Sequence, residues 1–261
     1  MKHRSDAIDL LKYYFISLVA LTLSGLIFKG LFVFYNHALF SSLDTTDIFY
    51  ALFWGIRFDL AAAAFFSFIS CLVLWLFNLF RVRRNPAMLL LLAMLLLQMT
   101  LQIGDTMYFA EAGRHVSYEM RDVFTDAGGL LKTALTNHIL FILLSYLVGA
   151  VVIAVVLGVT VKYLVSANKL RPLSVFRFHH GVKLIAILLL TVLLLRGGLG
   201  GVPQSILHAF KIGDPQQAVI TMNGAYSIVY GAIKSGKDIQ QLAIVLPKGT
   251  DETAIMQSLY P

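Results

Sequence analysis

The sequence has few charged residues and almost no cysteine, and both shortages narrow the class of protein. Only 13% of its 261 residues are Asp, Glu, Lys or Arg, whereas 58% are hydrophobic and the mean hydropathy is +0.78. Because soluble domains carry about 25% charged residues, the composition predicts a polytopic membrane protein. The single cysteine, Cys71, excludes an intrachain disulfide and gives no indication of a redox compartment.

Motifs that carry catalysis are also missing. The sequence has no Gly-rich phosphate loop with its Lys, no pair of cysteines, no His-Glu-x-x-His and no Gly-x-Ser-x-Gly. The adjacent His179 and His180 would point about 100° apart on a helix. Their surroundings are basic, which favours a solvated pair over a metal site. We therefore predict no catalytic residue and no metal ligand within this chain.

Two connections lack charges of one sign, and this asymmetry predicts the topology. Residues 36–47 contain no Lys or Arg, whereas residues 162–183 contain five basic residues and no acid. Basic loops remain in the cytoplasm, so the N-terminus is expected inside and the C-terminus outside a bacterial cytoplasmic (inner) membrane. The net charge of +7 belongs largely to such flanking residues, and we predict no nucleic-acid binding.

The apolar runs predict an all-α fold, a polytopic membrane bundle of five transmembrane helices. The first is a retained span, because no cleavage pattern for a signal peptide follows it, and the fifth is short, so its flanking Lys and Arg must reach the interfaces. Residues 1–197 form the transmembrane domain, and residues 198–261 are expected to form a helical extracytoplasmic linker or collar. The predicted spans are 13–35, 48–80, 87–104, 139–161 and 182–196.

The segment between the third and fourth spans is the most polar connection. Apolar residues recur on one helical face, which predicts an amphipathic helix on the outer membrane surface that ends at Gly128-Gly129. These apolar residues are Val116, Met120, Val123 and Phe124.

Charged residues inside the spans mark a candidate site. Gly55-Ile56-Arg57-Phe58-Asp59-Leu60 places an Arg and an Asp within an otherwise apolar run. A charge at membrane depth costs about 2.5–3.5 kcal/mol on insertion scales, so such groups face a protein interior or water. The alternative is an ion pair that only fixes packing or depth. Lys29 interrupts the first span, and its long stem is expected to carry the ammonium to the headgroup level.

Arg57 and Asp59 need partners from other segments, because residues two apart point about 200° apart around a helix. We expect Arg57 to contact Asp105 at the end of the third span. Asp59 is then expected to contact Arg196 or Arg114.

Three groups of motifs resemble the membrane half of the lipoteichoic acid synthase-like phosphoglycerol transferases, members of the alkaline phosphatase/sulfatase superfamily. These enzymes are similar in turn to the phosphoethanolamine transferases. The motifs follow one another along the chain: residues 55–60; Asp105-Thr106-Met107-Tyr108-Phe109 with Arg114; and Arg196-Gly197-Gly198-Leu199 followed by Asn223-Gly224-Ala225-Tyr226-Ser227.

The resemblance implies the membrane part of such an enzyme. The family's external domain supplies a threonine nucleophile and a divalent metal, usually manganese, and this chain reaches Pro261 before any such domain. No cofactor is therefore expected in the chain itself, which is predicted to be inactive alone. The expected role is to anchor the enzyme and admit an anionic phospholipid such as phosphatidylglycerol. Expected partners are the bilayer and a separate catalytic chain.

The resemblance and the charges together define the candidate lipid-headgroup cluster. The arginines of this cluster are expected to offer bidentate donors to a phosphate, and its acids to hold the guanidinium groups. Its tyrosine is expected at the headgroup level. Only the resemblance suggests that its asparagine returns to the cluster. The members are Arg57, Asp59, Asp105, Tyr108, Arg114, Arg196 and Asn223.

A second class of function is a non-enzymatic inner-membrane protein, either a small transporter or a partner subunit. In such a protein the internal charges would line a path or an interface. An internal repeat would favour a transporter, and the sequence contains none.

Overall fold

The computed structural model describes residues 10–79, 86–117, 125, 127–164, 178–200 and 203–241, and all regular elements in these ranges are helices. The predicted all-α fold is thereby confirmed. Four of the helices are long and apolar enough to cross a membrane. They are α1 (Leu10–Tyr35), α2 (Thr45–Leu79), α3 (Ala87–Ala112) and α6 (Ile139–Leu164).

The fifth predicted span corresponds to α7 (Phe178–Arg196), which is shorter than the other four. Its first two turns contain two histidines and Lys183, so its continuous apolar part is brief. Within the described ranges α7 does not join the four membrane-spanning candidates. The count of five spans therefore stays a prediction.

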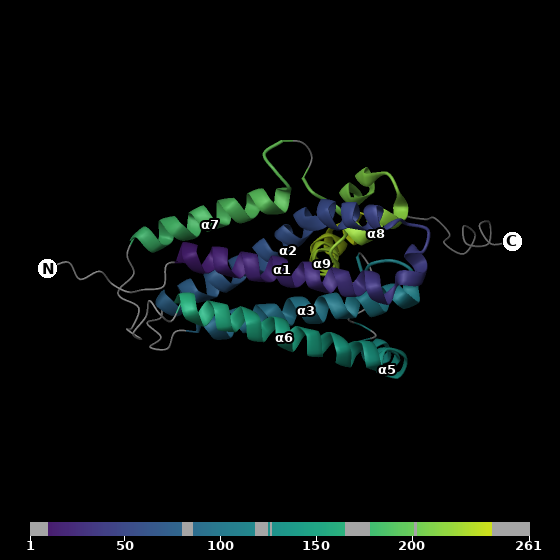
Figure 1. The fold of residues 1–261 in the computed structure, drawn as a ribbon. Coiled ribbons are helices and arrows are strands. Elements are labelled where there is room, and N and C mark those ends of the chain that lie inside the picture. Colours follow the sequence, from purple (N-terminus) through teal and green to yellow (C-terminus); the bar gives the residue numbers. More distant parts are fainter. Residues whose placement is uncertain are drawn as a thin grey trace, which may run out of the picture.

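Helix α1 occupies the centre of the bundle and packs against α2, α3, α6 and α7 (Figure 1). Hydroxyl groups reinforce this apolar packing. The Tyr13 hydroxyl bonds Ser70 of α2, and the Tyr14 hydroxyl bonds Thr191 of α7. Pairing of this kind satisfies polar groups that would otherwise be buried without partners.

Short helices gather at one end of the bundle, which we call the α5 end (Figure 1). Here α1 and α3 finish and α2 and α6 begin. Helix α9 is viewed almost along its axis in Figure 1, so it runs across the long helices rather than beside them. The short elements and α9 are η1 (His37–Phe40), α5 (Ala127–Asn137), η2 (Ile206–Ile212), α8 (Pro215–Thr221) and α9 (Gly224–Gln241).

The polar segment after the third predicted span differs from the expectation. Helix α3 continues through it to Ala112 and ends at Gly113, whose φ of 70° and N–H bond to the Phe109 carbonyl form a left-handed cap. Val116 is therefore not helical. Met120, Val123 and Phe124 of the predicted amphipathic helix lie outside the described residues.

Gly128 and Gly129 do not interrupt helical structure, because both lie in the first turn of α5. The end of the helix predicted before them lies outside the described residues. Glycine weakens a helix by only about 1 kcal/mol relative to alanine. The two together do not outweigh the apolar residues that follow them in α5.

Helices α8 and α9 begin at side-chain caps. The Asp214 carboxylate accepts the Gln217 N–H, and Pro215 occupies the first helical position. Two residues separate α8 from α9, and the second of them, Asn223, accepts the Tyr226 N–H through its side-chain oxygen at 2.9 Å. Because α8 packs against α2 and α9 against α3, these caps fix the α8–α9 junction against the long helices. The boundary predicted at residue 198 stays a prediction.

Candidate functional site

A buried ion pair joins α1 to α2. The Lys29 ammonium lies 2.7 Å from the Asp59 carboxylate, and the two side chains are 2% and 0% exposed. The ammonium also donates to the Gly55 carbonyl at 3.2 Å and to the Thr221 carbonyl at 3.1 Å. All three ammonium protons therefore have acceptors. The expectation that Lys29 reaches the headgroup level is wrong, since inward acceptors satisfy the charge without a path to water.

Asn223 ties the α8–α9 junction to this ion pair. Its side-chain N–H donates to the second oxygen of Asp59 at 2.6 Å, while its side-chain oxygen caps α9. One amide thus uses its donor on α2 and its acceptor on α9. The return of Asn223 to the cluster agrees with the expectation.

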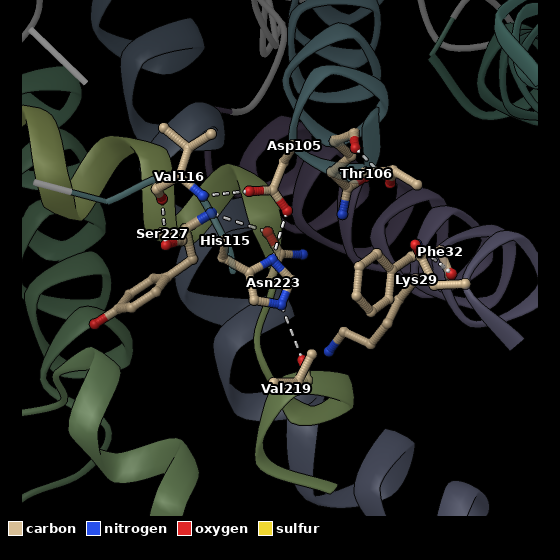
Figure 2. A network of polar contacts seen from close by, with 12 residues as sticks. Lys29, Phe32, Asp105, Thr106, His115, Val116, Val219, Asn223 and Ser227 are labelled. Carbon is tan, nitrogen blue, oxygen red and sulfur yellow. Dashed lines mark hydrogen bonds and ion pairs between the residues drawn. The ribbon is translucent and has the colours of Figure 1, made fainter. Parts of the chain in front are cut away.

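A second acid, Asp105 of α3, lies at the start of α9. A Cβ atom added to Gly224 would come within 2.3 Å of the Asp105 carboxylate, so only glycine permits this approach. Asp105 accepts the Val116 N–H at 2.9 Å and bonds the His115 ring at 2.6 Å (Figure 2). The first turn of a helix favours a negative charge. Asp105 therefore links α3, the turn after it and α9.

His115 bridges Asp105 and α8 in a way that requires two ring protons. Its Nδ1 faces the Asp105 carboxylate, and its Nε2 faces the Val219 carbonyl at 3.0 Å (Figure 2). A carbonyl oxygen only accepts, so Nε2 carries a proton, and the Nδ1 contact with an ionised carboxylate requires another. Burial disfavours the charged ring, but the Asp105 charge and both hydrogen bonds outweigh it and raise the pKa of His115.

The raised pKa gives the fold a pH dependence of known sign. The pKa of His115 is higher in the folded than in the unfolded chain. Protonated His115 therefore stabilises the folded chain fully below about pH 6.5, the ordinary pKa of histidine. This contribution to the free energy of unfolding is lost as the pH rises through the folded-state pKa. We expect His115→Gln to remove this loss. Thermal unfolding followed by circular dichroism at pH values across the neutral range measures it.

His208 is the matched control for this experiment. Burial and then the charges of Lys211 and Arg57 lower its pKa, so its own contribution has the opposite sign and grows as the pH rises. His208→Gln should leave the His115-dependent loss in place. Parallel unfolding curves for His115→Gln and the unchanged chain would contradict the assignment.

The three arginines do not form the contacts that the sequence predicted. Arg57 donates to the His208 carbonyl at 2.8 Å, and its guanidinium stacks 4.2 Å from the Trp54 ring centre. The expected contact of Arg57 with Asp105 is wrong, because Asp105 bonds His115 and the turn instead. The expected pairing of Asp59 with Arg196 or Arg114 is also wrong, because Lys29 and Asn223 occupy both carboxylate oxygens.

Arg114 and Arg196 lie at helix ends. Arg114 is exposed in the turn after α3, and Arg196 is the exposed last residue of α7. The structure thus brings together Asp59, Asp105 and Asn223 of the predicted cluster.

The two bases missing from the prediction are Lys29 and His115. A lysine within an apolar run was a signal for the first. A histidine beside the α3 acids was a signal for the second, but that position was assigned to a helix. A cavity of about 10 Å³ lies between the two bases, lined also by Asp105, Asn223 and Gly224.

A much larger apolar cavity, which we call the α3–α5 groove, adjoins this cluster. Its volume is about 670 Å³, within the range of about 300–1,000 Å³ of small-molecule sites. Asp105 contributes to both cavities, and Tyr108 of the predicted cluster also lines the groove. Its walls include Leu101, Ile103, Gly104, Met107, Tyr108, Leu130, Leu131, Ala134, Leu135, Ile142, Tyr146 and Ile228.

In the described part of the chain no three His, Cys, Asp or Glu side chains gather closely enough to hold a metal ion. The expectation that the chain has no metal ligand stays a prediction. No known protein family, curated protein or solved structure matches the chain.

Proposed function

We propose that the chain is the membrane anchor and lipid-presenting domain of a cell-envelope enzyme that transfers phosphoglycerol or phosphoethanolamine. The observation that carries the proposal is the meeting of the motif segments. Asp59 from the second predicted span bonds Asn223 of the last motif group, and Asp105, just after the third predicted span, packs closely against the adjacent Gly224. Segments far apart in sequence that resemble one family thus share one place.

The turn at Arg114 supports presentation of a phosphate. Arg114 lies between Ala112 and Val116, which both line the α3–α5 groove. A guanidinium suits a phosphodiester because it offers paired donors. In the proposed topology the α5 end faces outward from a bacterial cytoplasmic membrane, with the N-terminus in the cytoplasm. Manganese and the threonine nucleophile would belong to a catalytic domain or separate chain.

Lipid retention by the purified chain tests the proposal. We expect native mass spectrometry from mixed micelles to show phosphatidylglycerol retained in preference to phosphatidylcholine. Arg114→Gln should lower the ratio of the two by about tenfold, because a hydrogen bond to a charged group contributes about 1.5–3 kcal/mol. Lys132→Gln, which removes an exposed cation from α5, is the matched control.

Equal retention of both lipids would contradict the proposal, as would equal losses in the two variants. The first result would favour a non-enzymatic membrane protein, the second class that the sequence allows. The sealed Lys29–Asp59 pair does not support a transport path through this part of the bundle, because both side chains are almost fully buried.

A further inference from the structure

The α3–α5 groove has the length of one membrane leaflet. Its lining on α3 extends from Thr100 to Ala112. The helix rises about 18 Å between these two residues, close to half of the roughly 30 Å hydrocarbon core of a bilayer. An apolar groove of this length fits a hydrocarbon chain.

The groove lies beside the apolar outer face of α6. Ile142 and Tyr146, one turn apart, line it, while the adjacent Leu143 and Leu147 are 60% and 64% exposed. In a membrane-spanning helix these exposed leucines face lipid. A hydrocarbon chain can therefore enter from the bilayer without crossing a polar surface.

One end of the groove is polar. His138, at the junction of α5 and α6, bonds Glu111 at 2.9 Å and also bonds the Tyr35 hydroxyl. Asn137 donates to the same Glu111 oxygen at 3.1 Å. The Glu111 side chain is half exposed. At the opposite end the lining residues Thr100 and Tyr146 pair their hydroxyls with each other at 3.1 Å. The groove thus carries its Glu–His pair at the α5 end and uncharged side chains at the other, which is the polarity of a phospholipid.

We propose that the α3–α5 groove binds one acyl chain of an outer-leaflet phospholipid, with the headgroup at the end marked by Glu111 and His138. The proposal deepens the proposed function and rests on it for the orientation of the leaflet. It adds a chain-binding site that lies beside the buried polar cluster. It also explains why so large an apolar cavity persists between helices that otherwise pack closely.

Two glycines allow the groove to be filled with a matched control. A Cβ atom added to Gly104, which lines the groove, meets no atom within 4 Å. Gly158, exposed on α6 and not part of the groove lining, has the same free space. Gly104→Phe should therefore occupy the groove, whereas Gly158→Phe makes the same helical substitution elsewhere. Ala134→Phe, from the opposite wall, replaces the first variant if it does not fold.

Photoactivatable phospholipids measure the occupancy. Phosphatidylglycerol and phosphatidylcholine, each with a diazirine in the middle of one acyl chain, are reconstituted with the whole chain and illuminated. Peptide mass spectrometry then gives the ratio of labelling at the groove residues Leu130, Leu131 and 133–135 to labelling at the exposed face near Leu147. We expect Gly104→Phe to lower this ratio by about tenfold, because filling a pocket removes most of the ligand's buried surface. Gly158→Phe should leave it unchanged.

The outcomes separate the groove from the proposed function. Groove labelling by both lipids that Gly104→Phe abolishes supports chain binding, even where headgroup preference fails. If neither Gly104→Phe nor Ala134→Phe changes the labelling ratio, acyl-chain binding in the groove is overturned. If phosphatidylglycerol is still retained preferentially in that case, the proposed function stands. Cross-linking between two copies through the groove also overturns chain binding, because the occupant would then be protein.

Discussion

Lys29→Met is expected to destabilise the folded chain by about 3–5 kcal/mol, because it leaves the Asp59 carboxylate buried without its cation. The carboxylate is fully buried, and the Asn223 amide would then be its hydrogen-bond partner among the described residues. The Gly55 and Thr221 carbonyls lose a donor at the same time. Unfolding of the purified chain in micelles, followed by circular dichroism, measures the difference.

A double-mutant cycle separates the missing charge from lost packing. Asp59→Asn alone keeps an oxygen that can accept from Asn223 and lets Lys29 retain both carbonyl acceptors. Combining it with Lys29→Met removes the uncompensated charge, so the double variant should be more stable than Lys29→Met.

Lys12→Met controls for loss of a lysine from the same helix. Lys12 is exposed near the start of α1, and a surface change of this kind should stay within about 0.5 kcal/mol. A Lys29→Met effect no larger than that of Lys12→Met would contradict a buried ion pair.

The long helices could be predicted from the sequence because each one needs only a continuous apolar run. The predicted third span stopped at Gly104, where polar residues begin, yet α3 continues to Ala112. The turns of α3 beyond the predicted end, residues 105–112, lie where α3 packs against α9, and the cap at Gly113 ends the helix. A hydropathy pattern records where lipid contact ends, and a helix that continues into protein contacts extends beyond it.

The acids of the cluster could be predicted, but their partners could not. A carboxylate in an apolar run has to find a donor, which identified Asp59 and Asp105. The choice of donor depends on contacts between distant segments, such as the hydrogen bond from Lys29 to Thr221, which are 192 positions apart. Near the end of a span, the local sequence cannot distinguish a lysine that reaches outward from one that meets α8 inside the bundle.

Arg57, in the motif at residues 55–60, has partners that charge alone did not predict. Arg57 has an acid two residues away, and charge alone favoured a carboxylate partner. It instead stacks on Trp54 and donates to a backbone carbonyl of η2. An arginine can satisfy its donors with carbonyls and its flat face with an aromatic ring. Neither kind of partner is visible as a charge in the sequence.

Gly55→Ala is expected to destabilise the chain by about 1–3 kcal/mol, the usual cost of overpacking a close-fitting interior. The added Cβ atom would lie 2.6 Å from both the Lys29 ammonium and the Thr221 carbonyl oxygen. The lysine side chain can shift, but the Thr221 backbone belongs to α8 and moves only with that helix. The glycine of the motif at residues 55–60 therefore has a steric role. It lets α8 approach α2 closely enough to share the ammonium.

Gly30→Ala is the matched control for Gly55→Ala. Gly30 also lies within a long apolar helix, α1, but a Cβ atom there meets nothing within 4 Å. Alanine should therefore stabilise that helix by about 0.5–1 kcal/mol through its higher helix propensity. The two substitutions are expected to change the free energy of unfolding in opposite directions, measured by denaturant titration of helicity in micelles. If Gly55→Ala were stabilising as well, α8 would not be packed against α2 at the ion pair, and the cluster would lose its tie to the α8–α9 junction.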